Sequence, residues 1–411
     1  MLRNSNNIKI NRKRIYFLFI LFSITFLLII YRLVFIQYLN ASEFKSYAEF
    51  QHIGEFVLDS RRGKILDRNG DELAISLNER TVYANPKLVV DSEYESKILA
   101  EILELDVENV KEKLDSKDLG FVYIQRKVSQ EKAEKIVEYN LPGIYFQNEA
   151  RRYYPLNDIA ASVIGFTGVD NNGLEGIELQ YEKVLRGIDG KAIAEKDVFG
   201  NIIPGENNTY IEPVDGKDVV LTIDSQIQYI AQEKLEEVVS EFGALSAISI
   251  VMNPKTGEIY SIAAYPGFDL NNYQEADPEL LYKISGISFT YEPGSTFKII
   301  NIASAIENNS VSKDQVFDLR PWIKVGDRVI REISRTNNIS YTTEEIIKYS
   351  CNVGAVTIAL SMGEKTFWES IKKFGFGEIT GIELPGEEKG LFYDYKTWPA
   401  STIGALAIGQ N

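Results

Sequence analysis

The chain has 411 residues, which predicts two or three domains, and its 45% hydrophobic residues are enough to form a core in each. A formal net charge of −15 argues against nucleic acid as a partner. The single cysteine excludes an intrachain disulfide. The single histidine, His52, argues against both a Ser-His-Asp triad and a histidine-based metal site. We therefore expect His52 to be structural or solvated and expect no metal site.

The N-terminus predicts a membrane anchor. Residues 1–14 contain five basic and no acidic residues, and residues 15–31 are uncharged and mostly apolar. Arg32 interrupts the apolar run, which resumes to Ile36 and is long enough to cross a bilayer. The basic flank predicts a cytoplasmic tail, with everything after Asn40 outside the cytoplasm. A cleaved signal peptide is the alternative, but the length of the run and the lack of an A-x-A site favour an uncleaved anchor.

A mixed region of strands, turns and helices follows the anchor. Residues 64–74 are typical of a strand, an Asn-Gly turn and a second strand. Within them, Asp67 and Arg68 are expected to form a structural ion pair, because no nucleophile or metal ligand accompanies them. Residues 91–140 predict two solvated helices on a small α/β lobe, and the glycine-rich residues 151–200 predict turns of a sheet.

A second domain is expected to begin near residues 213–217. Residues 219–223 predict a strand, and Asp224 and Ser225 predict the cap of a long helix over 226–242. Two apolar strands, 247–252 and 257–263, are expected to form a hairpin.

The strongest candidate site is the stretch Tyr291–Ile300, with the sequence YEPGSTFKII. Its Pro-Gly pair predicts a sharp turn into a helix that opens at Ser295. Ser295 and Lys298 then lie one helical turn apart on the same face. A lysine whose pKa is lowered in an apolar surround can take the proton of a serine, so this S-x-x-K pair predicts a nucleophile and its base.

The S-x-x-K spacing alone is weak evidence, because the chain contains five copies of it. The other four are interpreted as helix surface or polar loop. These are Ser42/Lys45, Ser129/Lys132, Ser310/Lys313 and Ser370/Lys373. The copy at Ser295 is distinguished by its Pro-Gly turn, its apolar helix and a partner motif downstream.

That partner motif is Ser350-Cys351-Asn352. Thr342 and Glu345 predict a capping box for the helix that precedes it, and apolar residues at helical spacing follow it. The triplet is therefore expected at a junction between two buried helices. The alternative is that Ser350 only caps a helix. The order of the motifs along the chain and their occurrence together argue against this alternative.

The combination of motifs resembles the class B penicillin-binding proteins. The blocks that carry the resemblance are YEPGSTFK, SCNVG, FGFGEITGIELPGE and ALAIGQ, together with RGxIxDRNGxxLA near residue 64 and the RRYYP…GFTG block. The resemblance covers the chain from about residue 15 and is nearer the division or sporulation branch than the elongation branch. It implies an α+β protein with a cytoplasmic tail (1–14), a transmembrane anchor (15–39), a pedestal or dimerisation domain (40–216) and a penicillin-binding transpeptidase domain (217–411).

The resemblance also implies the chemistry. Members of this family are anchored in the cell membrane by one span and cross-link peptidoglycan outside the cytoplasm. By position, Ser295 would be acylated by a stem pentapeptide, Lys298 would be its base, Ser350 would protonate the leaving D-alanine, and Asn352 would bind the substrate amide. The implied partners are stem peptides, β-lactam antibiotics and membrane proteins of the division or elongation complex, and no cofactor is implied.

The third family motif, K-T-G, is expected after the S-x-N triplet, where it binds the substrate carboxylate. Here the only copy, Lys255-Thr256-Gly257, precedes Ser295 and follows a proline, so we interpret it as a hairpin turn. The chain ends at Asn411 without a second copy. We therefore expect a C-terminally truncated transpeptidase domain, not competent as it stands because it lacks the K-T-G strand and an oxyanion donor.

Other functions remain open at this point. A β-lactamase or membrane penicillin sensor shares the two serine motifs, and a D,D-carboxypeptidase is a further rival, but the long pedestal argues against both. A structural protein of the division complex, acting only through its partners, is the alternative from a different class.

Overall fold

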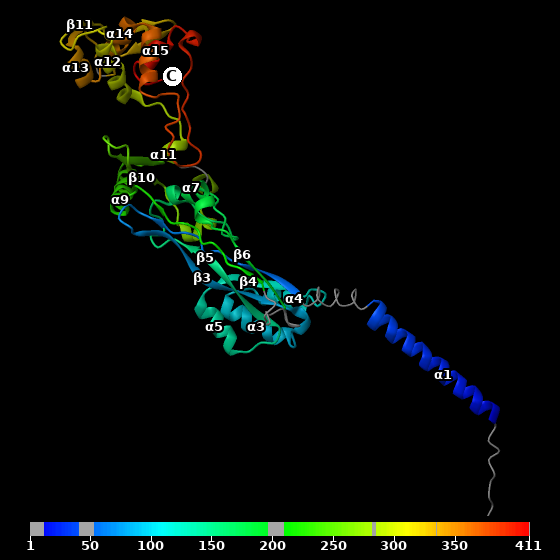
Figure 1. Ribbon diagram of the computed structural model, residues 1–411. Coiled ribbons are helices and arrows are strands. Elements are labelled where there is room, and N and C mark those ends of the chain that lie inside the picture. Colours follow the sequence, from blue (N-terminus) through cyan, green and yellow to red (C-terminus); the bar gives the residue numbers. More distant parts are fainter. Residues whose placement is uncertain (1–11, 41–52, 196–208, 282–284, 334, 411) are drawn as a thin grey trace, which may run out of the picture. The chain divides into compact units, whose positions relative to one another are not determined.

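The computed structural model describes residues 12–40, 53–195, 209–281, 285–333 and 335–410 (Figure 1). His52 and the Ser42/Lys45 pair lie outside these ranges. The chain divides into two compact units, Met1–Arg61 with Gly187–Gly216, and Arg62–Arg186 with Lys217–Asn411, which are described separately.

The first unit contains the apolar N-terminal helix and a small sheet. Helix α1 spans Arg12–Val34 and continues as the π-helical segment η1, Phe35–Leu39. Within them, Ile15–Tyr38 has a mean hydropathy of 2.5 and is long and apolar enough to cross a membrane. The sheet has the antiparallel order β1-β6-β7, formed by Ile53–Leu58, Gly190–Glu195 and Thr209–Ile211.

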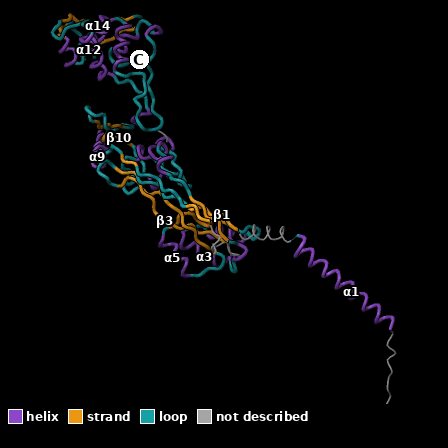
Figure 2. Tube along the Cα trace, in the orientation of Figure 1, coloured by secondary structure: helices purple, strands orange, loops and turns teal. Residues whose placement is uncertain are grey.

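The second unit begins with a sheet built around one long strand, β3 (Glu72–Ala84) (Figure 2). The strands that join it are β2 (Ile65–Leu66), β4 (Val122–Val128) and β5 (Ile144–Tyr153), all antiparallel to β3, and β8 (Val219–Val220), which runs parallel to β2. The Asn-Gly turn predicted between residues 64 and 74 is confirmed: it joins β2 to β3 with Gly70 at φ +92°.

Three helices cover this sheet where two were predicted. They are α3 (Ser92–Leu103), α4 (Val107–Asp115) and α5 (Gln130–Glu138), with strand β4 between the last two. The prediction missed β4, whose residues Ile124 and Val128 are buried with the helices. The helices are also less solvated than expected, since each buries an apolar face.

The glycine-rich segment contains one of the predicted turns, at residues 168–172 between the bridged residues Thr167 and Gly173, and also short helices that the prediction missed. After β5 come α6 (Ala161–Ile164), α7 (Gly176–Gln180) and α8 (Glu182–Leu185). Gly165 has φ +72°, and a Cβ there would lie 1.8 Å from the carbonyl oxygen of Glu175. Glycine is therefore required where the end of α6 meets the start of α7.

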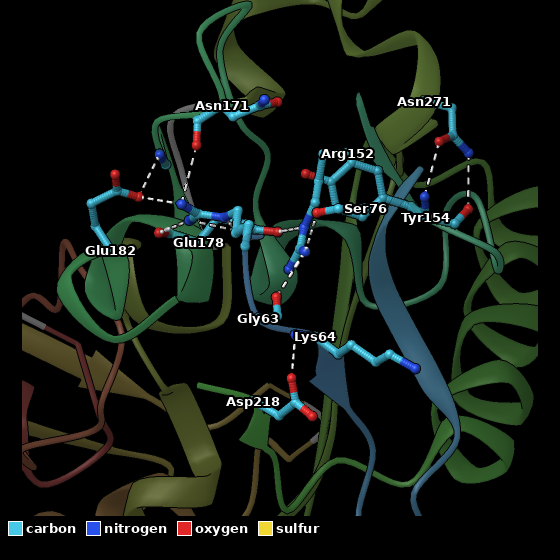
Figure 3. A network of polar contacts seen from close by, with 12 residues as sticks. Gly63, Lys64, Ser76, Arg152, Tyr154, Asn171, Glu178, Glu182, Asp218 and Asn271 are labelled. Carbon is cyan, nitrogen blue, oxygen red and sulfur yellow. Dashed lines mark hydrogen bonds and ion pairs between the residues drawn. The ribbon is translucent and has the colours of Figure 1, made fainter. Parts of the chain in front are cut away.

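A buried charge network fixes these short helices to the sheet (Figure 3). Glu178 is fully buried and accepts hydrogen bonds from the guanidinium groups of both Arg62 and Arg152. Arg152 also donates to the carbonyl oxygen of Gly63 at 2.8 Å. Each charge in this network has partners, as a buried charge requires.

Asp67 and Arg68 do not form the predicted ion pair with each other. Asp67 is fully buried and accepts hydrogen bonds from the backbone N–H groups of Asn69, Asp71 and Ser225. The Arg68 guanidinium lies 4.2 Å from the centre of the Tyr260 ring. Their role is still structural, since both connect the β2–β3 turn to the segment that starts near residue 224.

That segment opens with the predicted long helix and hairpin. Helix α9 spans Ser225–Phe242, and the Asp224 carboxylate caps it by accepting from Gln226 and Ile227 N–H. Strands β9 (Ala247–Met252) and β10 (Ile259–Tyr265) are antiparallel, and α9 packs on β10. The predicted strand over 219–223 is shorter than expected, because only β8 is paired.

After β10 come η3 (Leu270–Glu275), α10 (Pro278–Leu281) and α11 (Ser285–Ser288), and α11 contacts β9 and β10. The elements from α12 onward form a mainly helical lobe around α14 (Asn352–Met362). Most of α14 is buried, including Val356 and Ile358 with no exposed surface. Leu360, one of the apolar residues at helical spacing after the triplet, is 42% exposed. The elements around it are α12 (Lys298–Glu307), α13 (Thr343–Lys348), α15 (Glu364–Lys373), α16 (Thr402–Leu406), and the antiparallel pairs β11 (Val316–Leu319) with β14 (Ile339–Thr342) and β12 (Trp322–Val325) with β13 (Arg328–Arg331). Helices alternate with sheets whose paired strands are antiparallel, apart from the short pair β2·β8, and the predicted α+β class is confirmed.

Candidate active site

The turn that delivers Ser295 is formed as predicted and is fixed by a second glycine. Gly294 has φ +61° and begins a 3₁₀ turn, η4 (Gly294–Phe297), which leads directly into α12. The N–H of Gly294 donates to the carbonyl oxygen of Gly409 at 3.0 Å. A Cβ on Gly409 would lie 2.2 Å from the carbonyl oxygen of Gly294, so the two glycines pack backbone against backbone.

Ser295 and Lys298 differ sharply in exposure. Ser295 is exposed, whereas Lys298 at the first position of α12 is only 2% exposed. The preceding residue, Phe297, is also buried and packs edge-on against Phe376. A reachable hydroxyl therefore lies one turn before a buried amine.

The structure brings Lys298 together with the S-x-N triplet, 52 and more residues away in the chain. Its Nζ donates to the Ser350 carbonyl oxygen and to Asn352 Oδ1, each at 2.6 Å. The Ser350 hydroxyl lies 3.1 Å from the same nitrogen. Three of the four residues predicted for the site therefore meet at one amine, and the fourth, Ser295, lies a turn before it.

The electrostatics favour a neutral amine. Burial lowers the pKa of Lys298 below its ordinary value, and the Glu332 carboxylate and the Cys351 sulfur oppose that change without cancelling it. An amine with a lowered pKa has a larger neutral fraction near pH 7, which is the form that can accept a proton.

The S-x-N triplet lies at the predicted junction between two helices. The capping box of Thr342 and Glu345 is present at the start of α13. Ser350 follows α13 with φ +52°, the left-handed region that non-glycine residues rarely adopt. The cap of α14 is Cys351, whose sulfur accepts from the N–H of Gly354 at 3.3 Å. The alternative of ordinary capping by Ser350 is therefore wrong for this structure.

Sequence reasoning missed three residues around the site. Asn301 on α12 donates to the carbonyl oxygens of Ala355 and Ala407 and so joins α12, α14 and the end of α16. Gly409 supports the Ser295 turn as described above. Glu332 binds the S-x-N segment from the end of β13. Of these, only Gly409 lay in a block that carried the family resemblance.

The other S-x-x-K copies within the described residues have structural roles. Ser129 caps α5 by accepting from Lys132 N–H. Ser370 is 5% exposed and donates to the Thr366 carbonyl oxygen, which corrects the prediction of an exposed face. Lys313 is exposed and pairs with Glu344.

The K-T-G triplet forms the turn between β9 and β10, as predicted. Asn253 accepts from the N–H groups of Lys255 and Gly257, and Gly257 has φ +80°. The predicted hairpin is thereby confirmed. Among the described residues, no group of three or more His, Cys, Asp or Glu is placed to hold a metal ion.

A cavity of about 260 Å³ lies elsewhere, next to β5, and is lined by residues that include Lys127, Arg151, Arg152 and Tyr154. Arg151 pairs with Glu79 and Arg152 with Glu178, so much of its positive charge is neutralised by these partners. We do not assign the candidate active site to it, because the nucleophile and base motif lies at Ser295.

Comparison with known protein families finds two matches. Residues 57–221 match the penicillin-binding protein dimerisation domain, and residues 247–411 match the penicillin-binding protein transpeptidase domain.

Two curated relatives align over most of the chain. Stage V sporulation protein D of Bacillus subtilis is 35% identical over 404 residues, covering 97% of this chain and 62% of that protein. The peptidoglycan D,D-transpeptidase FtsI of Escherichia coli K12 is 29% identical over 360 residues, covering 86% of this chain and 60% of that protein. The chain thus spans about three fifths of the length of these relatives.

A similar solved structure is penicillin-binding protein 3 of Mycobacterium tuberculosis in complex with aztreonam. It has a TM-score of 0.62 at 25% identity, over 87% of this chain and 61% of that one. The two domain matches, their order and the relatives agree with the fold described above. The chain therefore belongs to the class B penicillin-binding proteins.

Proposed function

We propose that this chain is a membrane-anchored peptidoglycan D,D-transpeptidase that works through an acyl-enzyme on Ser295. The observation that carries the proposal is Lys298, an amine only 2% exposed, held by Ser350 and Asn352 one helical turn after an exposed serine. A buried amine beside a reachable hydroxyl is the arrangement that activates a serine without histidine.

The hydrogen bonds of Lys298 fit a base. The Ser350 carbonyl oxygen and Asn352 Oδ1 can accept both N–H bonds of a neutral amine, which leaves its lone pair for a hydroxyl proton. In the proposed reaction the Ser295 oxygen bonds to the carbonyl carbon of the penultimate D-alanine. The proton of Ser295 passes to Lys298. As the C–N bond breaks, the Ser350 hydroxyl gives its proton to the nitrogen of the departing D-alanine and takes the proton held by Lys298, whose Nζ lies 3.1 Å away, so both side chains return to their starting states.

The second half of the reaction restores Ser295. A neutral amine of a neighbouring stem peptide attacks the ester carbon and gives up a proton to Lys298. The C–O bond to Ser295 breaks as the amide cross-link forms, and the proton passes from Lys298 to the Ser295 oxygen, which restores the hydroxyl. A β-lactam would acylate the same serine and remain there. The aztreonam complex of the similar Mycobacterium tuberculosis protein supports β-lactam binding by this chain.

The cellular role we propose is septal or sporulation wall synthesis together with other membrane proteins. The names of the two relatives, a sporulation protein and FtsI, support this assignment. We also propose a boundary between the pedestal and transpeptidase domains near residue 216, which lies close to the end of the first domain match at residue 221.

The test of the acyl-enzyme is labelling with a fluorescent penicillin followed by peptide mass mapping. The acylation measurements use a version of the chain extended to full domain length. In it we expect label on Ser295 alone, none in Ser295→Ala, and unchanged labelling in Ser129→Ala, whose serine caps helix α5. Lys298→Ala should acylate about 10²–10⁴-fold more slowly, the usual loss when a general base is removed. Penicillin found on any other serine would refute the assignment of the nucleophile.

We further propose that α1 anchors the chain in the cytoplasmic membrane with the large domains outside. The five basic residues before Ile15 support this orientation. Protease added to intact protoplasts should then degrade the protein to a short membrane-protected fragment. Survival of the large domains until the membrane is lysed would reverse the orientation.

A further inference from the structure

Glu332, which directly follows strand β13, binds the segment that carries the S-x-N triplet. Its side chain is 10% exposed. Its Oε1 accepts from the N–H of Val353 at 2.6 Å and from the thiol of Cys351 at 3.1 Å. A charge-assisted bond to a backbone N–H is among the stronger hydrogen bonds in proteins.

The thiol is a donor in this arrangement. Burial raises the pKa of Cys351 to about 11, with the nearby Glu332 carboxylate acting in the same direction, so the S–H proton is retained at neutral pH. The same sulfur accepts from Gly354 N–H as the cap of α14. Cys351 thus connects the carboxylate to the first turn of α14.

Residues 331 and 332, at the end of β13, form hydrogen bonds with three consecutive residues, 351–353. Next to Glu332, the carbonyl oxygen of Arg331 accepts from Asn352 Nδ2 at 3.1 Å. Cys351, Asn352 and Val353 are therefore each bonded to residues 331–332. Just before them stands Ser350, whose φ of +52° is unfavourable for a serine and persists only where the surrounding structure holds it.

Residues 350–353, which residues 331 and 332 bind, include the hydrogen-bond acceptors of Lys298. The Ser350 carbonyl oxygen and Asn352 Oδ1, both 2.6 Å from Nζ, flank Cys351 in the chain. A shift of this segment would move both acceptors at once. We propose that Glu332 is a positioning residue of the Ser295–Lys298 site, because its carboxylate fixes the segment that holds the Lys298 amine.

The charge of Glu332 also acts on the amine. Among the described residues, the charged and titratable groups that affect Lys298 are Glu332 and Cys351. Glu332 in turn faces Arg335, whose Nη2 lies 3.8 Å from the carboxylate and whose Nη1 donates to the carbonyl oxygens of Leu319 and Asn337. Burial lowers the pKa of Lys298 and Glu332 raises it, so the carboxylate limits how far the pKa falls.

This inference rests on the proposed function. Two variants separate the effect of the Glu332 charge from the effect of its hydrogen bonds. Glu332→Gln keeps an oxygen that can accept from Val353 and Cys351 but removes the charge. Glu332→Ala removes both the charge and the hydrogen bonds. Glu344→Gln is the matched control, since Glu344 is an exposed carboxylate on α13 that pairs with Lys313.

The experiment is a pH titration of Lys298 in the purified full chain, followed by NMR of ¹³Cε-labelled lysine and assigned with Lys298→Arg. In Glu332→Gln the pKa of Lys298 should fall below that of the unchanged chain, whereas Glu344→Gln should leave it in place. An unchanged Lys298 pKa in Glu332→Gln would overturn the electrostatic part of the inference.

Penicillin acylation is measured on the same samples across pH. In Glu332→Gln the acid limb should move to lower pH, and in Glu332→Ala the maximal acylation rate should fall at least tenfold while penicillin binding before acylation changes little. A role only in stability would lower the melting temperature without these changes and would refute the positioning role. If the unchanged chain is not acylated at Ser295, the proposed function fails instead, and the NMR titration still tests Glu332.

Discussion

Lys298 combines near-complete burial with three polar partners, and this combination controls when its amine is neutral. Burial disfavours the ammonium form and lowers the pKa. The carbonyl and amide oxygens keep the nitrogen in one place in either protonation state. A surface lysine, such as Lys313 with its exposed pairing to Glu344, has neither property.

The pH dependence of acylation should report this residue. With the neutral amine as the proposed base, the acylation rate should rise with pH through the pKa of Lys298, at a pH below the ordinary lysine value of 10.5. The free energy of unfolding should also rise with pH in this range. Between the lowered pKa of folded Lys298 and 10.5, the unfolded chain binds a proton on Lys298 that the folded chain does not, so unfolding becomes less favourable as pH rises toward 10.5.

The measurement is the rate of fluorescent penicillin attachment across pH, compared with Lys298→Ala. The variant should lose the rising limb together with most of the rate. A limb that persists in Lys298→Ala would assign the titration to another group.

At the scale of elements, the site depends on contacts between helix ends. The 3₁₀ turn before α12 meets the chain that follows α16, through the hydrogen bond from Gly294 to Gly409. Asn301 repeats the connection deeper in the lobe by binding carbonyl oxygens of both α14 and residue 407. The positions of Ser295 and Lys298 are thus set by segments about a hundred residues further along the chain.

Gly409→Ala tests this packing. Its Cβ would lie 2.2 Å from the Gly294 carbonyl oxygen, and its φ is +72°, so alanine requires the Ser295 turn to move. We expect a loss of stability of roughly 1–3 kcal/mol together with slower acylation of Ser295.

Gly363→Ala is the matched control. Gly363 has φ +77°, but a Cβ added there would meet nothing within 4 Å, so alanine carries the backbone penalty without the clash. Melting temperature and penicillin acylation are measured for both. Equal effects of the two substitutions on acylation would show that the contact with Gly294 does not position Ser295.

Across the molecule, a few buried polar groups join segments far apart in the chain. Asp67 is fully buried and accepts from both the N–H and the hydroxyl of Ser225, 158 residues away. Burial would raise the pKa of Asp67, but the backbone hydrogen bonds from Asp71, Ser225 and Asn69 bring it below the ordinary value. The turn after β2 is therefore tied to the first turn of α9.

Asp67→Ala should destabilise this unit by about 2–4 kcal/mol, because it leaves several buried N–H donors without an acceptor. Since the folded pKa is lowered, the contribution of Asp67 is present above the ordinary value of 3.8 and is lost as pH falls through the folded pKa.

Thermal unfolding of the unchanged chain, Asp67→Ala and Asp71→Asn between pH 7 and pH 3 checks this expectation. Asp71 is an exposed carboxylate in the same turn and serves as the control. A melting temperature for Asp67→Ala equal to that of Asp71→Asn at pH 7 would contradict the structural role.

The local features of this protein could be predicted from its sequence alone. The apolar run of α1, the caps at Asp224 and Thr342, the turn at residues 255–257 and the spacing of Ser295 and Lys298 by one turn all depend on residues within a few positions of one another. Such features follow from hydrophobic period and capping chemistry, which neighbouring residues decide. The family motifs added the connection between Ser295 and Ser350.

The surroundings of the site follow from how the chain packs. Packing placed Lys298 against Ser350 and Asn352 and made Cys351 the helix cap. It also brought in Glu332, which no sequence pattern had marked, and Gly409, which lay in a family block without an assigned role. It also replaced the expected Asp67–Arg68 pair by contacts to Ser225 and Tyr260. These partners are brought together only in the folded chain, because burial makes a polar group bond to whichever segment is packed against it, however distant in sequence.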